Sequence, residues 1–252
     1  MKACGVLLLW GDVSNAEPQL PDLEDATAAE VVRWATETFG QGLALACSFQ
    51  KEESVLLDYL FAADSKARVF ALDTDLLFPE TYDLLATVEE KYSTKIERWR
   101  GPTLEAQAAE HGAELWKSNP TACCQLRKIG PLKDGLGKLD AWITGIRRDQ
   151  SPARANAKKV EWDAQFGLVK INPLADWSDK DVWREVHARS LPYHPLHDQG
   201  FASIGCVPCT NPGEGREGRW AGTGKVECGL HEDQQDGAPA KGAADHSAVK
   251  VA

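Results

Sequence analysis

Cysteine side chains have the clearest capacity for chemistry in this sequence, and four of them form two pairs. Cys123 is followed directly by Cys124, and Cys206 and Cys209 enclose a Val-Pro dipeptide. Four thiolates that folding brings together suit either a tetrahedral zinc ion or an iron–sulfur cluster. Adjacent cysteines reach one compact ion less easily than the separate irons of a cluster. The spacing therefore favours iron–sulfur and leaves zinc as the alternative.

A further cysteine, Cys228, stands apart from both pairs in the stretch Glu-Cys-Gly-Leu-His, which ends at His231. Positive neighbours lower the pKa of a thiol from about 8.5 and increase the fraction present as nucleophilic thiolate. The polar surroundings argue against a buried structural cysteine. We therefore interpret Cys228 as a reactive thiol, whereas Cys47 lies in an apolar run and is interpreted as a core residue.

Basic residues that could bind an anion stand out because the net charge of the chain is −10. Arginine matches the oxygens of phosphate and sulfate through bidentate contacts. Lys128 follows Cys124 by four residues, a spacing that puts two side chains on one helix face. Two more groups of basic residues follow in the sequence. They are Arg147, Arg148, Arg154, Lys158 and Lys159, and then Arg216 and Arg219. Each basic group could equally lie on a solvated surface.

Short apolar runs that alternate with helical patterns predict the scaffold of these residues. The expected strands are 43–49, 67–72, 95–99, 141–145 and 168–171, and the expected helices are 28–39, 51–61, 79–92, 103–111 and 179–188. Alternation of this kind predicts an α/β fold with a doubly wound, mostly parallel sheet. Ligands of such sheets bind beyond the carboxyl ends of the strands, where the strand order reverses.

Two of the expected strands end in polar residues. The first is followed by Ser48, Phe49 and Lys51 at the start of a helix, where backbone N–H groups suit a phosphate or sulfate. The second ends in Asp73 and Thr74, and Asp73 could bind a ribose or simply order its loop. The first loop is not a Walker A motif, because GxxxxGK[ST] is absent.

Composition limits the class of protein. A chain of 252 residues with 43% hydrophobic residues can bury the core of one α/β domain or of two small ones. The negative charge argues against a nucleic-acid partner. No apolar run is long enough to span a membrane, so we expect no membrane partner. Seven cysteines, an odd number, fit ligands and a reactive thiol in a reducing cytoplasm. We expect a poorly ordered lead-in over 1–25, a domain over 26–231 and a disordered tail over 232–252.

Taken together, the two cysteine pairs and the Glu-Cys-Gly-Leu-His stretch resemble the assimilatory APS/PAPS reductase family, over residues 43–231. The resemblance implies an adenine-nucleotide α-hydrolase-like fold and a 4Fe–4S cluster on Cys123, Cys124, Cys206 and Cys209. It makes Cys228 the nucleophile, with His231 beside it, and puts Lys128 between cluster and substrate. The implied substrate contacts are Ser48, Phe49, Lys51, Asp73, Thr74, Arg147, Arg148, Arg216 and Arg219.

The resemblance also implies a reaction. Adenosine 5′-phosphosulfate (APS) would be reduced to sulfite and AMP through an S-sulfocysteine, with an external thioredoxin as electron donor. Four cluster cysteines resemble the enzymes that prefer APS to its 3′-phosphorylated form, PAPS. The alternatives are a PAPS reductase, or a zinc-stapled nucleotide-binding or tRNA-modifying protein of the same architecture. A homo-oligomer is compatible with either.

Two details of the basic and acidic residues follow from this interpretation. Asp75 stands where the family usually has glycine, and we expect it to point away from an anionic ligand. Lys158 and Lys159 could receive a 3′-phosphate, but we expect both side chains to face solvent.

Overall fold

A six-stranded sheet forms the centre of the computed structural model, which describes residues 19–220 together with Lys225 and Gly229. The strand order is β3-β2-β1-β4-β6-β5, and only β5, at one edge, runs antiparallel to its neighbour. The expected doubly wound, mostly parallel sheet is thus confirmed. The strands are β1 Leu43–Ala46, β2 Arg68–Leu72, β3 Glu97–Trp99, β4 Ala141–Ile143, β5 Val160–Asp163 and β6 Leu168–Ile171.

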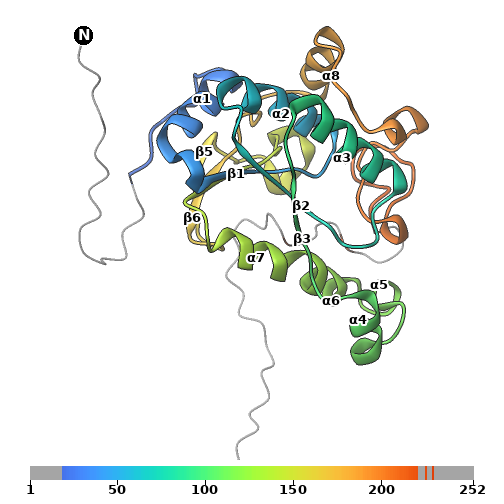
Figure 1. The fold of residues 1–252 in the computed structure, drawn as a ribbon. Coiled ribbons are helices and arrows are strands. Elements are labelled where there is room, and N and C mark those ends of the chain that lie inside the picture. Colours follow the sequence, from blue (N-terminus) through green and yellow to red (C-terminus); the bar gives the residue numbers. More distant parts are fainter. Residues whose placement is uncertain (1–18, 221–224, 226–228, 230–252) are drawn as a thin grey trace, which may run out of the picture.

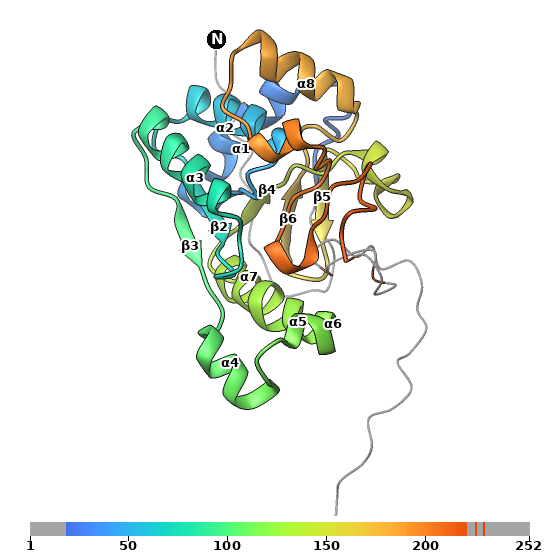
Figure 2. The ribbon, with the colours of Figure 1, turned by 90° about the vertical axis from the view of Figure 1, so that its right-hand side faces the viewer.

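Helices cover both faces of the sheet (Figure 1). One layer comprises α1 Ala28–Phe39, α2 Lys51–Ala63, α3 Pro79–Tyr92 and α8 Asp179–Ala188. The other face is covered by α7 Gly130–Leu136, and the short helices before it lie on the same side of the sheet (Figure 2). These are α4 Leu104–His111, α5 Leu115–Ser118, α6 Pro120–Cys124 and a π-helical turn over Gln125–Ile129.

The alternation of side chains along each strand divides the core between the two faces. In β1, Leu43 and Leu45 join the larger cluster under α1, α2, α3 and α8, whereas Ala44 points to the other face. There it meets Phe70 and Trp142, which pack against α7. Strands that are buried on both faces appear in the sequence as continuous apolar runs. For this reason they could be located from the sequence.

Local capping explains why three helices begin where expected. The side chain of Thr27 accepts a hydrogen bond from the backbone N–H of Glu30, and Ser178 does the same for Asp181, so each forms a capping box. Pro79 occupies the first turn of α3, where its missing N–H costs nothing.

The stretch between residues 115 and 136 differs from the expectation, which placed only Cys124 and Lys128 on one helix face and gave no helix bounds there. Pro120 and Pro131 interrupt the periodicity of the sequence, yet both occupy the first turn of a short helix, α6 and α7 respectively. Between them, the backbone N–H of Gly130 donates to the carbonyl oxygen of Gln125, the i→i+5 pattern of a π-helix.

Part of the predicted lead-in belongs to the fold. Within 19–25, Leu20 and Leu23 pack against the larger core cluster. A carboxylate oxygen of Glu24 accepts a hydrogen bond of 2.8 Å from the backbone N–H of Lys159. Residues 1–18 and the predicted tail over 232–252 lie outside the described residues.

The expectation that Lys159 faces solvent is wrong. Its side chain is buried, and Nζ donates to the carbonyl oxygens of Glu24 and Ala26, at 2.7 Å each, and pairs with Asp176 at 2.8 Å. Lys158 is exposed, as expected. Successive side chains of an extended segment point to opposite sides, so the two neighbours have different surroundings.

The topology places a ligand site at one position along the sheet. The chain runs from β1 outward to β2 and β3 on one side, and then to β4 and β6 on the other. The strand order therefore reverses between β1 and β4, where the loops at the carboxyl ends diverge and leave a crevice. Among the described residues, no helix has the length and apolar character needed to cross a bilayer.

Candidate functional site

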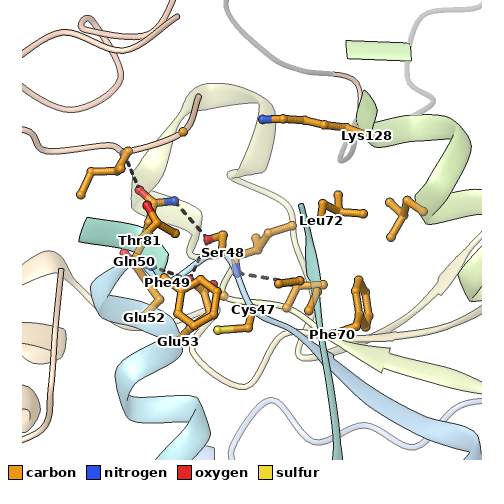
Figure 3. A pocket seen from close by; sticks show the side chains of 18 of the residues that line it. Cys47, Ser48, Phe49, Gln50, Glu52, Glu53, Phe70, Leu72, Thr81 and Lys128 are labelled. Carbon is orange, nitrogen blue, oxygen red and sulfur yellow. Dashed lines mark hydrogen bonds between the residues drawn. The ribbon is translucent and has the colours of Figure 1, made fainter. Parts of the chain in front are cut away.

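A pocket opens at this reversal of strand order (Figure 3). The loop after β1 forms one wall with Ser48 and Phe49, and Thr144 and Gly145 after β4 form another. Lys128 reaches across the pocket from the opposite side (Figure 3). The pocket therefore lies where a doubly wound sheet binds its ligand.

The loop between β1 and α2 is tightly constrained. Phe49 is buried and has a φ of 61°, a left-handed conformation that is uncommon for a bulky residue and often found at functional sites. Ser48 Oγ donates to Glu53 at 2.8 Å, and the backbone N–H of Gln50 donates to the same carboxylate oxygen at 3.1 Å. Glu53 thus accepts two of the hydrogen bonds that a phosphate was expected to accept from this loop.

Glu53 is a buried acid in the wall of the pocket. Burial, and secondarily the charge of Glu52, raises the pKa of Glu53 to about 8. Its other carboxylate oxygen lies close to the backbone of Gly145, where a Cβ atom would be only 2.2 Å away. At neutral pH the carboxyl group of Glu53 is therefore largely protonated, and glycine is required at position 145.

Cations line the other side of the pocket and supply the charge that an anion needs. They are Lys128, Arg154, Arg216 and Arg219. Arg219 is held in place, because its Nη1 donates to Ser203 Oγ and to the carbonyl oxygen of Ile204, at 3.2 Å each. Its guanidinium also lies over the ring of Trp220 at 4.5 Å. The basic residues, rather than the β1–α2 loop, therefore supply the positive charge of the pocket wall.

Glycine at position 205 allows this arginine to approach. A Cβ atom there would lie 2.3 Å from Nη2 of Arg219, well inside van der Waals contact. Any larger residue would displace either the guanidinium or the backbone that leads into Cys206. Gly205 therefore links the pocket to the neighbouring cysteine pair.

The structure brings the two cysteine pairs together beside the pocket. Cys123 and Cys124 end α6, and the bridge between Leu77 and Cys206 holds the second pair against the loop after β2. Burial, followed by the proximity of the other three thiols, raises the pKa of Cys123 to about 11. The four cysteines form no disulfide with one another. Among the residues that the structure describes, no three metal-ligating side chains form a group able to hold a single ion.

Two cations lie between the thiols and the pocket. Lys128 and Arg219 line both the pocket and the small cavity between the cysteine pairs. Burial and then Cys206 raise the pKa of Cys209, while Lys128 and Arg219 act in the opposite direction. The same two side chains can thus interact with negative charge on the sulfurs and with a negative ligand in the pocket.

The loop after β2 supports the thiols. Thr74 Oγ1 and Cys206 Sγ are 3.3 Å apart and share a hydrogen bond. Asp75 has a φ of 55°, a conformation that favours glycine, and its carboxylate faces the guanidinium of buried Arg127 at 3.6 Å. Asp75 thus points away from the pocket, as expected, and contributes to the support of the α6 region.

Several residues expected to bind substrate have other partners in this structure. Arg147 is buried and donates to Glu52 at 2.9 Å and to Asp179 at 3.1 Å, and it also pairs with Asp149. Lys51 pairs with Asp179 at 2.7 Å. These contacts join α2, α8 and the loop after β4, and neither cation lines the pocket.

Asp73 and Arg148 also lie outside the pocket lining. Asp73 accepts hydrogen bonds from Tyr82 Oη at 2.8 Å and from Arg100 Nε at 3.0 Å. Arg148 donates to the carbonyl oxygen of Ala157 at 2.8 Å and pairs with Glu24. Of the expected contacts, the pocket is lined by Ser48, Phe49, Lys128, Arg216 and Arg219.

Sequence reasoning missed some residues that line the pocket. Gln50, Glu53 and Gln150 were not singled out, and Arg154 was noted only as part of a basic stretch. Gln150 accepts a hydrogen bond of 2.5 Å from Arg154 Nη1, so one loop positions both. The acids in the first turn of α2 were a usable signal, because carboxylates there compete with an external anion.

The expected nucleophile Cys228 and its neighbour His231 lie outside the described residues. Two residues of the same stretch are described. Lys225 Nζ donates to Thr121 Oγ1 at 3.3 Å, and the carbonyl oxygen of Gly229 accepts from Gln165 Nε2 at 3.2 Å.

Comparison with known proteins gives matches over most of the chain. Residues 42–212 match the phosphoadenosine phosphosulfate reductase domain. An adenosine 5′-phosphosulfate reductase from Salinibacter ruber is 47% identical over 212 residues, covering 82% of this chain and 84% of the relative. A crystal structure of phosphoadenylyl-sulfate reductase from Candida auris, in complex with phosphate, matches with 30% identity and a TM-score of 0.65, covering 75% of this chain and 94% of that chain.

A more distant match concerns the fold alone. The FMN adenylyltransferase of Candida glabrata is 17% identical and has a TM-score of 0.53 over 73% of this chain and 63% of that chain. Its nucleotide chemistry differs, but the sheet and its helices are shared. The adenine-nucleotide α-hydrolase-like fold is therefore confirmed.

The raised pKa of Glu53 predicts a specific pH dependence of stability. A carboxyl group with an ordinary value of 4.5 and a folded value of about 8 stabilises the protein at low pH. This contribution is lost as the pH rises from about 5 to about 8, because the folded state must then release a proton that it holds more tightly. We expect Glu53→Gln to remove this dependence, so that the variant gains stability relative to wild type by a few kcal/mol, in order of magnitude, between pH 5 and pH 8.5.

The measurement is urea unfolding of ligand-free protein at pH 5.5, 7.0 and 8.5. Glu37→Gln serves as the control, because Glu37 is exposed and should leave the profile of the wild type unchanged. Parallel pH profiles for wild type and Glu53→Gln would show that the carboxyl group is ionised throughout, contrary to the expectation.

Proposed function

Since the chain belongs to the phosphoadenosine phosphosulfate reductase domain family, we propose that it reduces adenosine 5′-phosphosulfate to sulfite and AMP with electrons from a thioredoxin. The observation that carries this proposal is the pair Lys128 and Arg219, which lines both the pocket and the thiol cavity. An anionic nucleotide in the pocket would then lie beside a sulfur-rich centre. The relative from Salinibacter ruber, an adenosine 5′-phosphosulfate reductase with 47% identity, supports the choice of substrate.

In the first chemical step, Cys228 acts as the nucleophile. Its thiolate attacks the sulfur of the sulfate group of APS, and the bond between that sulfur and the bridging phosphate oxygen breaks. AMP leaves with the bonding electron pair, and the negative charge on its phosphate is stabilised by Lys128, Arg216 and Arg219. The product is an S-sulfocysteine at position 228. His231, three residues further on, is placed by the sequence to influence the protonation of this thiol.

The second step releases sulfite. A thiolate of reduced thioredoxin attacks the Cys228 sulfur, sulfite leaves with the electron pair of the S–S bond, and a mixed disulfide forms. The second thiol of thioredoxin resolves the mixed disulfide, so the two electrons come from its dithiol. Thioredoxin is a reductant of the cytoplasm, where the free thiols of the described cysteines would also persist.

The cysteine pairs fit a 4Fe–4S cluster held by Cys123, Cys124, Cys206 and Cys209. A cubane distributes its ligands over four irons, so it accepts a wider arrangement than one zinc ion does. The four thiols line a common cavity, and Lys128 and Arg219 act to lower the pKa of one of them, Cys209, against the effect of its burial. When bound, the cluster would add negative charge beside these cations. Zinc remains the alternative occupant.

The charges around the pocket favour a substrate with no 3′-phosphate. A second phosphate brings close to two further negative charges at neutral pH and needs donors of its own. Lys159 is buried among its own partners, and Glu53 occupies the donors of the β1–α2 loop. Lys158 is exposed but does not line the pocket. We therefore assign APS rather than PAPS.

The choice of substrate is tested by initial rates with each nucleotide and thioredoxin in excess. We expect kcat/KM for APS to exceed that for PAPS by at least about tenfold, since each 1.4 kcal/mol of unfavourable charge is worth that factor. A ratio of one or less would make the protein a PAPS reductase. Lys158→Ala is the control, and it should leave the ratio unchanged because that side chain is exposed and outside the pocket lining.

The covalent role of Cys228 is tested by Cys228→Ser. This variant should retain its iron and bind AMP with unchanged affinity, because the described pocket is intact, yet it should release no sulfite. With wild type and APS in the absence of thioredoxin, mass spectrometry should detect a sulfonate on the peptide that contains Cys228. Normal turnover by Cys228→Ser would disprove the assignment, and Cys47→Ala should have little effect on catalysis.

The identity of the metal is tested by analysis of protein purified without oxygen. We expect about four irons and four acid-labile sulfides per chain. Cys206→Ser should lose both iron and sulfide, whereas Cys228→Ser should lose neither. One equivalent of zinc without sulfide would instead support the zinc-stapled alternative.

A further inference from the structure

One amide side chain in the loop after β4 connects the pocket to the buried ion pairs beside it. Gln150 ends the short 3₁₀ helix Arg148–Gln150 and lines the pocket, as Arg154 does. Its Oε1 accepts a hydrogen bond of 2.5 Å from Arg154 Nη1 and one of 3.1 Å from the backbone N–H of Arg147. The oxygen of this amide therefore binds two donors of its own loop.

The nitrogen of the same amide faces two acceptors on neighbouring elements. Gln150 Nε2 donates to Glu52 Oε1, in the first turn of α2, and to the carbonyl oxygen of Gly145, at 3.3 Å each. Glu52 Oε1 also accepts from Arg147 Nε at 2.9 Å. A glutamine amide offers two lone pairs and two N–H donors, so these four contacts use its whole capacity. They also determine which way the amide group points.

Arg154 is held at both its backbone and its guanidinium. The backbone N–H of Arg154 donates to the carbonyl oxygen of Ser151, and the N–H of Ala157 donates to the carbonyl oxygen of Arg154, at 3.0 Å each. The side chain is buried, and Gln150 binds the Nη1 end of its guanidinium. A long side chain that is fixed before a ligand arrives loses less freedom on binding.

The partners of Gln150 require a neutral amide at this position. A carboxylate there could accept from Arg154 with one oxygen, but its other oxygen would face Glu52 Oε1 and the carbonyl oxygen of Gly145. Glu52 is itself buried, and like charges repel strongly where water is excluded. Glutamine supplies an acceptor on one side and a donor on the other, which no carboxylate does.

We propose that Gln150 is a positioning residue that holds the guanidinium of Arg154 for an anionic group of the nucleotide in the pocket. The proposal deepens the proposed function and rests on it for the identity of the ligand. It adds Arg154 to the cations that bind the substrate and gives the buried pair of Glu52 and Arg147 a connection to the pocket. Gln150 acts through Arg154, because its amide already has its full set of partners within the protein.

The coupling is tested by isothermal titration calorimetry with AMP and full-length, anaerobically purified protein. Gln150→Met keeps the length of the side chain but removes the amide, and we expect AMP to bind about three- to tenfold more weakly, the effect of one hydrogen bond. Arg154→Met should weaken binding at least as much. When Arg154→Met is already present, Gln150→Met should have no further effect, because its influence passes through the guanidinium. Gln199→Met is the control, an exposed glutamine outside the pocket lining.

A second variant, Gln150→Glu, makes the requirement for a donor depend on pH. At pH 8.5 the introduced carboxylate should repel Glu52 and release Arg154. At pH 6.0 the charge of Glu52 favours protonation of the new carboxyl group, which can then donate to Glu52 and still accept from Arg154. We expect the loss of AMP affinity relative to wild type to be at least about threefold smaller at pH 6.0 than at pH 8.5, the scale of one hydrogen bond.

Wild type at the same pH is the reference for Gln150→Glu, because the charged groups that border this amide are the same in both proteins. They are Glu52, Glu53, Arg147, Asp149, Arg154 and Asp179.

Three results would overturn the proposal. They are wild-type AMP affinity in Gln150→Met, additive effects of Gln150→Met and Arg154→Met, and an equal loss at both pH values in Gln150→Glu. A failure of the proposed function has a different signature. If wild type reduced no APS while the two substitutions remained coupled in AMP binding, the proposed reaction would be wrong and the role of Gln150 in holding Arg154 would stand.

Discussion

The arrangement of this site depends on one electrostatic constraint, which is that the proposed anion site and the proposed cluster site, both of which would hold negative charge, adjoin each other in a chain of net charge −10. Lys128 and Arg219 lie between the thiols and the pocket and face both. Short-range attraction in a buried site is far stronger than in water, so two well-placed cations can offset the field of the whole protein. The segments that carry them, the π-helical turn and the loop that follows Cys209, must therefore meet at the edge of the sheet.

A second set of charged residues stabilises the elements that border the pocket. Arg147 and Lys51 neutralise acids on α2, α8 and the loop after β4, and so hold together three elements that border the pocket. Buried ion pairs contribute little net stability, but removing one partner is costly because a buried charge is left uncompensated. Such a network fixes geometry, and it leaves Arg154 of the same loop to line the pocket.

Local patterns in the sequence predicted much of the fold, because capping and periodicity act over a few residues. Thr27, Pro79 and Ser178 each marked a helix start that the structure confirms. The two cysteine pairs could be expected to lie close together because four thiols can hold one metal ion or cluster. The partners of Arg147 could not be predicted, since Glu52 lies 95 residues away. The burial of Lys159 and the raised pKa of Glu53 could not be predicted either, because both depend on packing against segments that are distant in the sequence.

The π-helical turn after the first cysteine pair has a consequence for the helical phase of everything that follows it. An α-helix advances by about 100° per residue, so a turn that accommodates one extra residue rotates the next helix by that angle relative to the one before. Here α6 directs Cys123 and Cys124 to the thiol cavity, while α7 directs Leu132 and Leu136 to the sheet. In a continuous α-helix of the same sequence, Leu132 and Leu136 would be rotated by about 100° relative to the two cysteines. The extra residue thus acts as a phase shift that lets one run of helix serve the sulfur-rich centre and the hydrophobic core.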